Sequence, residues 1–63
     1  MLEVRLIGPR YNRFGAERDH YENVETGEVY VDTAYNREKP RLCTITRAGE
    51  PDIPLRDGSF RVI

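Results

Sequence analysis

The residues with the clearest chemical character lie between positions 9 and 14, where arginines alternate with aromatic residues: Arg10, Tyr11, Arg13 and Phe14. Arginine neutralises phosphate and an aromatic ring stacks on a base, so this composition suits single-stranded nucleic acid. The same residue types are enriched at the hot spots of protein interfaces. A third interpretation is a structural loop that covers one end of the fold, with Tyr11 or Phe14 packed inside.

Charge is distributed unevenly along a chain whose net charge is −1. Residues 22–34 contain four acidic side chains and no basic one, whereas residues 35–47 contain Arg37, Lys39, Arg41 and Arg47 against one glutamate. One interpretation is that neighbouring strands pair these opposite charges across a sheet. The other is an acidic and a basic face that steer a charged partner, with Arg37 and Arg41 as binding residues. A pI near 5.7 favours a protein partner over nucleic acid.

The sequence offers little for catalysis or for a cofactor. Cys43 and His20 are the only cysteine and histidine, too few for a structural zinc site. A Cys–His nucleophile pair needs a cleft that 63 residues hardly provide. Asp52 and Asp57 are typical turn residues, and no glycine-rich phosphate loop occurs. We therefore expect no enzyme activity, no metal and no cofactor.

Short apolar segments separated by turn residues predict several β-strands. Apolar and charged residues alternate over 2–7, and Gly8-Pro9 is expected to end that strand. Residues 8–20 give no clear pattern, and a short helical turn over 16–20 is one possibility. Residues 20–34 predict a β-hairpin with its turn at 25–28.

The second half of the chain predicts three further strands, over 42–47, 53–55 and 60–63. The Asp57-Gly58 pair between apolar flanks indicates a tight hairpin turn joining the last two strands. Five or six strands with turns about every ten residues predict one mainly β domain over 1–63 with at most one short helix. The expected form is a small antiparallel barrel or sandwich, SH3-like or a reduced OB-like fold, because closure hides the sheet edges.

A domain of this size buries only about 60% of the surface of its unfolded chain, so its stability is marginal. One cysteine excludes an intrachain disulfide. We therefore expect a partner to add to its stability, either a larger protein or a second copy of the chain. No apolar segment is long enough for a membrane span, and we expect a cytoplasmic protein.

The preferred function is a small non-catalytic protein-binding module, that is, an adaptor, an inhibitor or an assembly component. Small proteins encoded by phages often have this make-up. The alternative is a small β-barrel that binds RNA or single-stranded DNA through the arginine and aromatic residues of 9–14.

Overall fold

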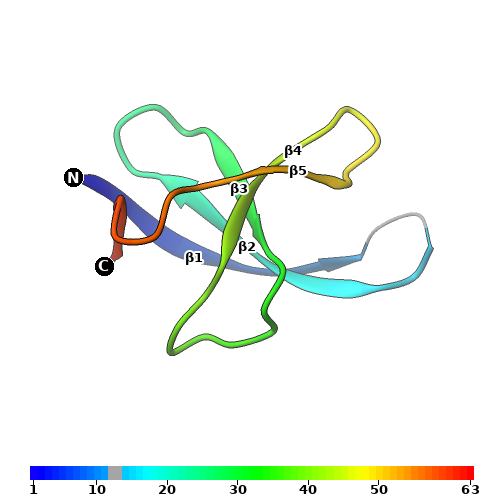
Figure 1. Ribbon diagram of the computed structural model, residues 1–63. Coiled ribbons are helices and arrows are strands. Elements are labelled where there is room, and N and C mark those ends of the chain that lie inside the picture. The colour runs from blue at the N-terminus through cyan, green and yellow to red at the C-terminus, as the bar shows by residue number, and fades with distance from the viewer. Residues whose placement is uncertain (12–13) are drawn as a thin grey trace.

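The computed structural model describes residues 1–11 and 14–63. They form six strands in a single sheet with the order β5-β4-β3-β2-β1-β6 (Figure 1). The strands are β1 (Leu2–Tyr11), β2 (Glu17–Asn23), β3 (Val29–Asp32), β4 (Leu42–Ile45), β5 (Pro51–Pro54) and β6 (Phe60–Val62).

The prediction of a mainly β protein with five or six strands is confirmed, and no helix occurs in the described ranges. The sheet is not closed into a barrel, because β5 and β6 are its two ends and do not pair. Four of the five strand pairs are antiparallel, while β1 and β6 are parallel. No helix of the described chain has the length and hydropathy needed to cross a membrane.

The first strand does not end at Gly8-Pro9 as predicted. The β1–β2 ladder shifts between Leu6 and Gly8, where Gly8 has a φ of 110°, and then continues to Tyr11. Such a bulge requires a conformation that glycine adopts without strain. Beyond Val4, β1 pairs only with β2, and a ladder on one side tolerates Pro9.

The possible helical turn over 16–20 is wrong, because β2 already begins at Glu17. Residues 17–20 are polar and show no apolar alternation. They are extended because β1 continues opposite them. Their side chains are polar and at most partly buried, so they leave no apolar alternation for the hydrophobic pattern to report.

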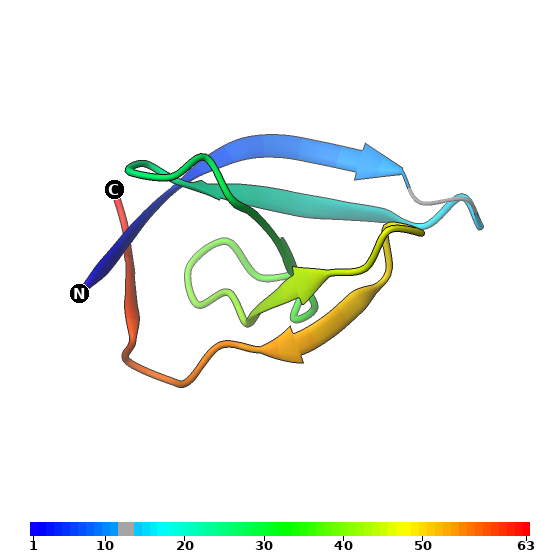
Figure 2. The same cartoon turned by 90° about the horizontal axis from the view of Figure 1, so that it is seen from above.

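The core lies on one face of the curled sheet and contains one large side chain from each of four strands: Val4, Tyr21, Tyr30 and Leu42. Leu2, Leu55 and Phe60 pack against this cluster. In Figure 2 the sheet curves so that β5 and the segment after it lie across the molecule from β1 and β2. Each fully buried side chain of this size contributes about 1.5–3 kcal/mol. Burial also raises the pKa of the Tyr21 hydroxyl.

The Asp57-Gly58 turn exists, but it does not form the predicted hairpin. The Ser59 N–H donates to the Arg56 carbonyl at 3.0 Å, and only Gly58 of this turn has a positive φ, at 77°. These features define a type II turn, whereas the tight hairpin turn expected here requires two positive φ values. The turn therefore directs β6 away from β5 and onto β1.

Candidate binding surface

The tip of the β1–β2 hairpin exposes the aromatic side chains that the sequence singled out. Tyr11 is 72% exposed, Phe14 is 73% exposed, and Arg10 also lies on the surface. The interpretation as a lid with Tyr11 or Phe14 packed inside is therefore wrong. The predicted binding residue Arg13 lies outside the described residues.

Two arginines face each other next to this tip. Arg10 lies directly opposite Arg18 in the β1–β2 ladder. Neither forms an ion pair with a carboxylate of the described chain. The Arg18 Nε is buried and has no hydrogen-bond acceptor there. Like charges directly opposite one another destabilise a sheet, so this pair costs the isolated fold energy and favours an external anionic group.

Tyr35 extends this surface onto a neighbouring loop. The Arg18 guanidinium carbon lies 5.0 Å from the centre of the Tyr35 ring, within the range of a cation–π interaction. Tyr35 itself is 64% exposed. Sequence reasoning missed both Arg18 and Tyr35, because their contact joins residues far apart along the chain. We refer to Arg10, Tyr11, Phe14, Arg18 and Tyr35 as the arginine–tyrosine surface.

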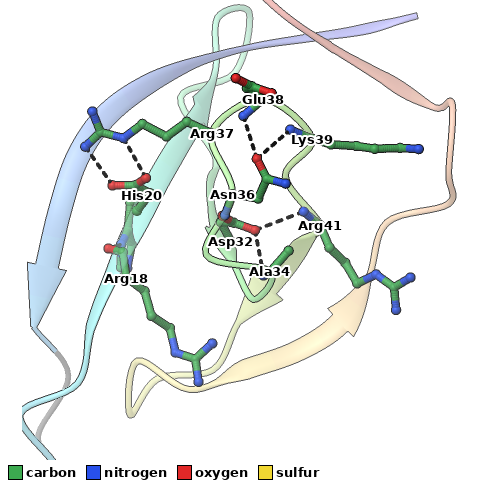
Figure 3. Close-up of polar contacts among 10 residues, drawn as sticks. Arg18, His20, Asp32, Ala34, Asn36, Arg37, Glu38, Lys39 and Arg41 are labelled. Carbon is green, nitrogen blue, oxygen red and sulfur yellow. Dashed lines mark hydrogen bonds and ion pairs between the residues drawn. The ribbon is translucent and has the colours of Figure 1, made fainter.

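The loop over residues 33–41 is organised by one buried carboxylate, that of Asp32, which is 1% exposed (Figure 3). Asp32 Oδ1 accepts from the N–H groups of Ala34 at 2.8 Å and Arg41 at 2.9 Å. Its Oδ2 accepts from the Asn36 N–H at 3.1 Å. Backbone hydrogen bonds to a charged acceptor are strong in a buried setting, so this carboxylate fixes both ends of the loop.

A second side chain supports the far part of the same loop. Asn36 Oδ1 accepts from the N–H groups of Glu38 at 2.9 Å and Lys39 at 3.2 Å. Tyr35, just before it, has a φ of 53°, an uncommon conformation for a non-glycine residue. The local hydrogen bonds stabilise this conformation and so determine where the Tyr35 ring lies.

Arg37 attaches the loop to β2. Its Nε and Nη2 donate to the two carboxylate oxygens of Asp19 at 2.8 and 3.1 Å (Figure 3). The bidentate hydrogen bond from Arg37 lowers the pKa of Asp19, although partial burial opposes this shift. Arg37, a predicted binding residue, is therefore engaged within the fold and positions the loop beside Arg18.

Replacing Arg37 with alanine is expected to raise the pKa of Asp19 toward its ordinary value. A carboxyl group whose pKa is lowered by folding stabilises the protein above its unfolded pKa, and this contribution is lost as the pH falls through the folded value. The variant should therefore be less stable than the wild type at neutral pH and equally stable in acid. Carboxyl-carbon NMR titration of Asp19 and thermal melts across pH measure both effects. Arg5→Ala, which removes the partner of Glu22, is the control and should leave the Asp19 titration unchanged.

A small hollow of about 160 Å³ lies beside the arginine pair. It is lined by Arg10, Tyr11, Ala16, Arg18, His20, Val31, Ala48 and Gly49. The His20 Nδ1 lies 2.9 Å from the Arg18 carbonyl, which can only accept, so this nitrogen carries the proton. The hollow combines two guanidinium groups with apolar walls, an environment that can accept an acidic side chain.

Arg41, the remaining predicted binding residue, lines a different and larger groove. This groove of about 710 Å³ lies between the loop and β6, and its lining includes Lys39, Arg41, Phe60 and Val62. The structure therefore places Arg10 and Tyr11 beside one hollow and leaves Phe14 exposed in the same hairpin, but it places Arg41 on a separate surface.

The predicted pairing of the acidic stretch with the basic stretch does not occur among the described residues. The described residues form three ion pairs, Arg5–Glu22, Arg37–Asp19 and Arg61–Glu3. The link between the two stretches is made instead by backbone, through the Arg41 N–H and the Asp32 carboxylate.

His20 and Cys43 are not placed for joint chemistry. Both pair with Val31, one from each side, so they are two strands apart. Two strand spacings amount to about 10 Å, too far for a thiol–imidazole hydrogen bond. No group of three or more potential metal ligands occurs in the described part of the chain.

Comparison of this chain with models of protein families, with curated proteins and with solved structures finds no match.

Proposed function

We propose that this protein is a small non-catalytic binding module, an adaptor or inhibitor, whose arginine–tyrosine surface binds an acidic segment of a larger protein. The observation that supports this most is the division of the six aromatic residues. Three lie in or against the core, whereas Tyr11, Phe14 and Tyr35 are 64–73% exposed. Exposed tyrosines and arginines in one area are typical of binding hot spots.

The arginine pair indicates that the partner segment is negatively charged. Arg10 and Arg18 are opposed without a described carboxylate between them, and the Arg18 Nε lacks an acceptor. A glutamate or aspartate of the partner would offset the repulsion between the two arginines by its charge. It would also accept the hydrogen bond that the Arg18 Nε lacks. Because one buried cysteine requires no oxidising compartment, we place this interaction in the cytoplasm.

Capture of partners from the native cell on immobilised protein tests the proposal. Nuclease-treated lysate should yield a protein that the wild type retains and that Tyr11→Ala and Arg10→Ala lose. Hot-spot truncations cost about 2 kcal/mol or more, which is a loss of roughly thirtyfold in affinity. Ile53→Ala, an equally exposed apolar side chain on β5, should retain the partner. Equal capture by all four proteins would exclude the arginine–tyrosine surface.

The alternative is binding of RNA or single-stranded DNA, which the same uncompensated arginines favour. Aromatic rings would then stack on bases and the arginines would contact phosphates. In that case capture would be lost on nuclease treatment. Arg10→Ala would also lower the slope of log affinity against log salt for an oligonucleotide by about 0.7. If the partner is a protein, by contrast, its capture does not depend on nuclease treatment.

A further inference from the structure

The last strand, β6, leaves one side of its backbone unpaired. The Leu2 N–H donates to Ser59 and the Ile63 N–H donates to Val4, so alternate residues of this segment face β1. In a parallel ladder the residues between them face the opposite way. The N–H and C=O groups of Phe60 and Val62 therefore point outward, and no described strand pairs with them.

The other end of the sheet is protected against such pairing. β5 begins with Pro51 and ends with Pro54, and proline has no N–H to offer a further strand. β6 contains no proline, and its one charged residue, Arg61, is already paired with Glu3. Of the two strands at the ends of the sheet order, β6 is thus the one whose backbone can pair with a further strand.

The lining of the 710 Å³ groove beside β6 indicates which kind of strand fits there. Phe60 and Val62 form its apolar side, and Val62 is 39% exposed. Its charged lining consists of two cations and two anions, namely Lys39, Arg41, Glu38 and Asp57. A groove without net charge does not select a strongly acidic or basic peptide. Its apolar side suits a strand with apolar side chains on the same face, which a second copy of β6 provides through its own Phe60 and Val62.

We propose that two copies of this chain associate through their β6 strands, antiparallel, so that the two sheets become one continuous sheet. With the two-fold axis at Arg61, Phe60 of one copy lies opposite Val62 of the other, and both outward-facing residues gain hydrogen-bonded partners. The two Arg61 side chains then lie opposite one another, and each is already paired with the Glu3 of its own copy. Pairing in one sheet keeps side chains on their own face, so Phe60 and Val62 of the second copy extend the core face across the groove. This contact is separate from the arginine–tyrosine surface and does not depend on it.

Sedimentation equilibrium of the purified chain across the micromolar range tests the proposal. We expect a reversible dimer for the wild type. Val62→Pro should give a monomer, because it removes an outward N–H while the inward bonds of residues 61 and 63 remain. Val62→Lys should also give a monomer, since it places a charged side chain opposite the apolar Phe60 of the second copy. Ile53→Lys is the matched control on the other edge strand and should remain dimeric.

Circular dichroism establishes that each variant is folded. If Val62→Pro does not fold, the oligomeric state of Val62→Lys tests the proposal alone. A wild type that is monomeric at every concentration would overturn the proposal. A dimer that survives in the folded Val62 variants, or that is lost equally in Ile53→Lys, would also overturn it. None of these results bears on capture through Tyr11 and Arg10, so the two proposals fail independently.

Discussion

Replacing Asp32 with alanine is expected to lower the free energy of unfolding by about 3 kcal/mol. The substitution leaves the N–H groups of Ala34, Asn36 and Arg41 without their acceptor, and each unpaired buried donor costs about 1–3 kcal/mol. Water reaches part of the opened loop, which places the total near the lower end of that sum. A domain of this length has only about 3–9 kcal/mol of stability. Urea denaturation monitored by circular dichroism measures the loss.

Asp32→Asn is the informative companion variant. An amide retains one oxygen, which still accepts from Ala34 and Arg41, but its NH₂ group meets the Asn36 N–H, so donor faces donor. We expect an intermediate loss of stability and a displaced Tyr35, with weaker capture of the partner. If Asp32→Ala were as stable as the wild type, the buried carboxylate would not organise the loop.

Replacing Tyr21 with alanine is expected to cost about 3–5 kcal/mol, the range for removing a large aromatic side chain from a core. Tyr21 is 1% exposed and belongs to the cluster with Val4, Tyr30 and Leu42, which joins four strands. In a domain of this size each kcal/mol lowers the melting temperature by about 4–8 °C. Thermal unfolding should therefore begin far below that of the wild type.

Tyr21→Phe separates packing from the hydroxyl. It retains the ring and should stay within about 1.5 kcal/mol of the wild type. It should also weaken the loss of stability at alkaline pH. Burial raises the pKa of Tyr21, so its contribution is present below the unfolded pKa and lost as pH rises through the folded value. A Phe variant as unstable as the Ala variant would show that the hydroxyl, and not the ring, carries the effect.

The strand-forming segments with an apolar pattern can be recognised in the amino-acid sequence. Alternation over 2–7, the hairpin around Gly27 and the apolar segments over 42–47 and 60–63 correspond to β1, β2–β3, β4 and β6. Each of these strands buries at least part of one face, and burial selects side chains that are visible locally. The sequence also singled out Arg10, Tyr11 and Phe14, because arginine and aromatic residues stand together there, but it left open whether the aromatic rings are exposed or packed inside.

Only the tertiary structure decided the features that depend on which strands meet. Pairing of β6 with β1 instead of β5 follows from the direction in which the Gly58 turn releases the chain, and no local pattern encodes it. The opposition of Arg10 and Arg18 depends on the register after the Gly8 bulge, where a shift of one residue changes every partner. The sheet is open, with β5 and β6 as its two ends, and the two prolines of β5 offer no N–H donors to a further strand.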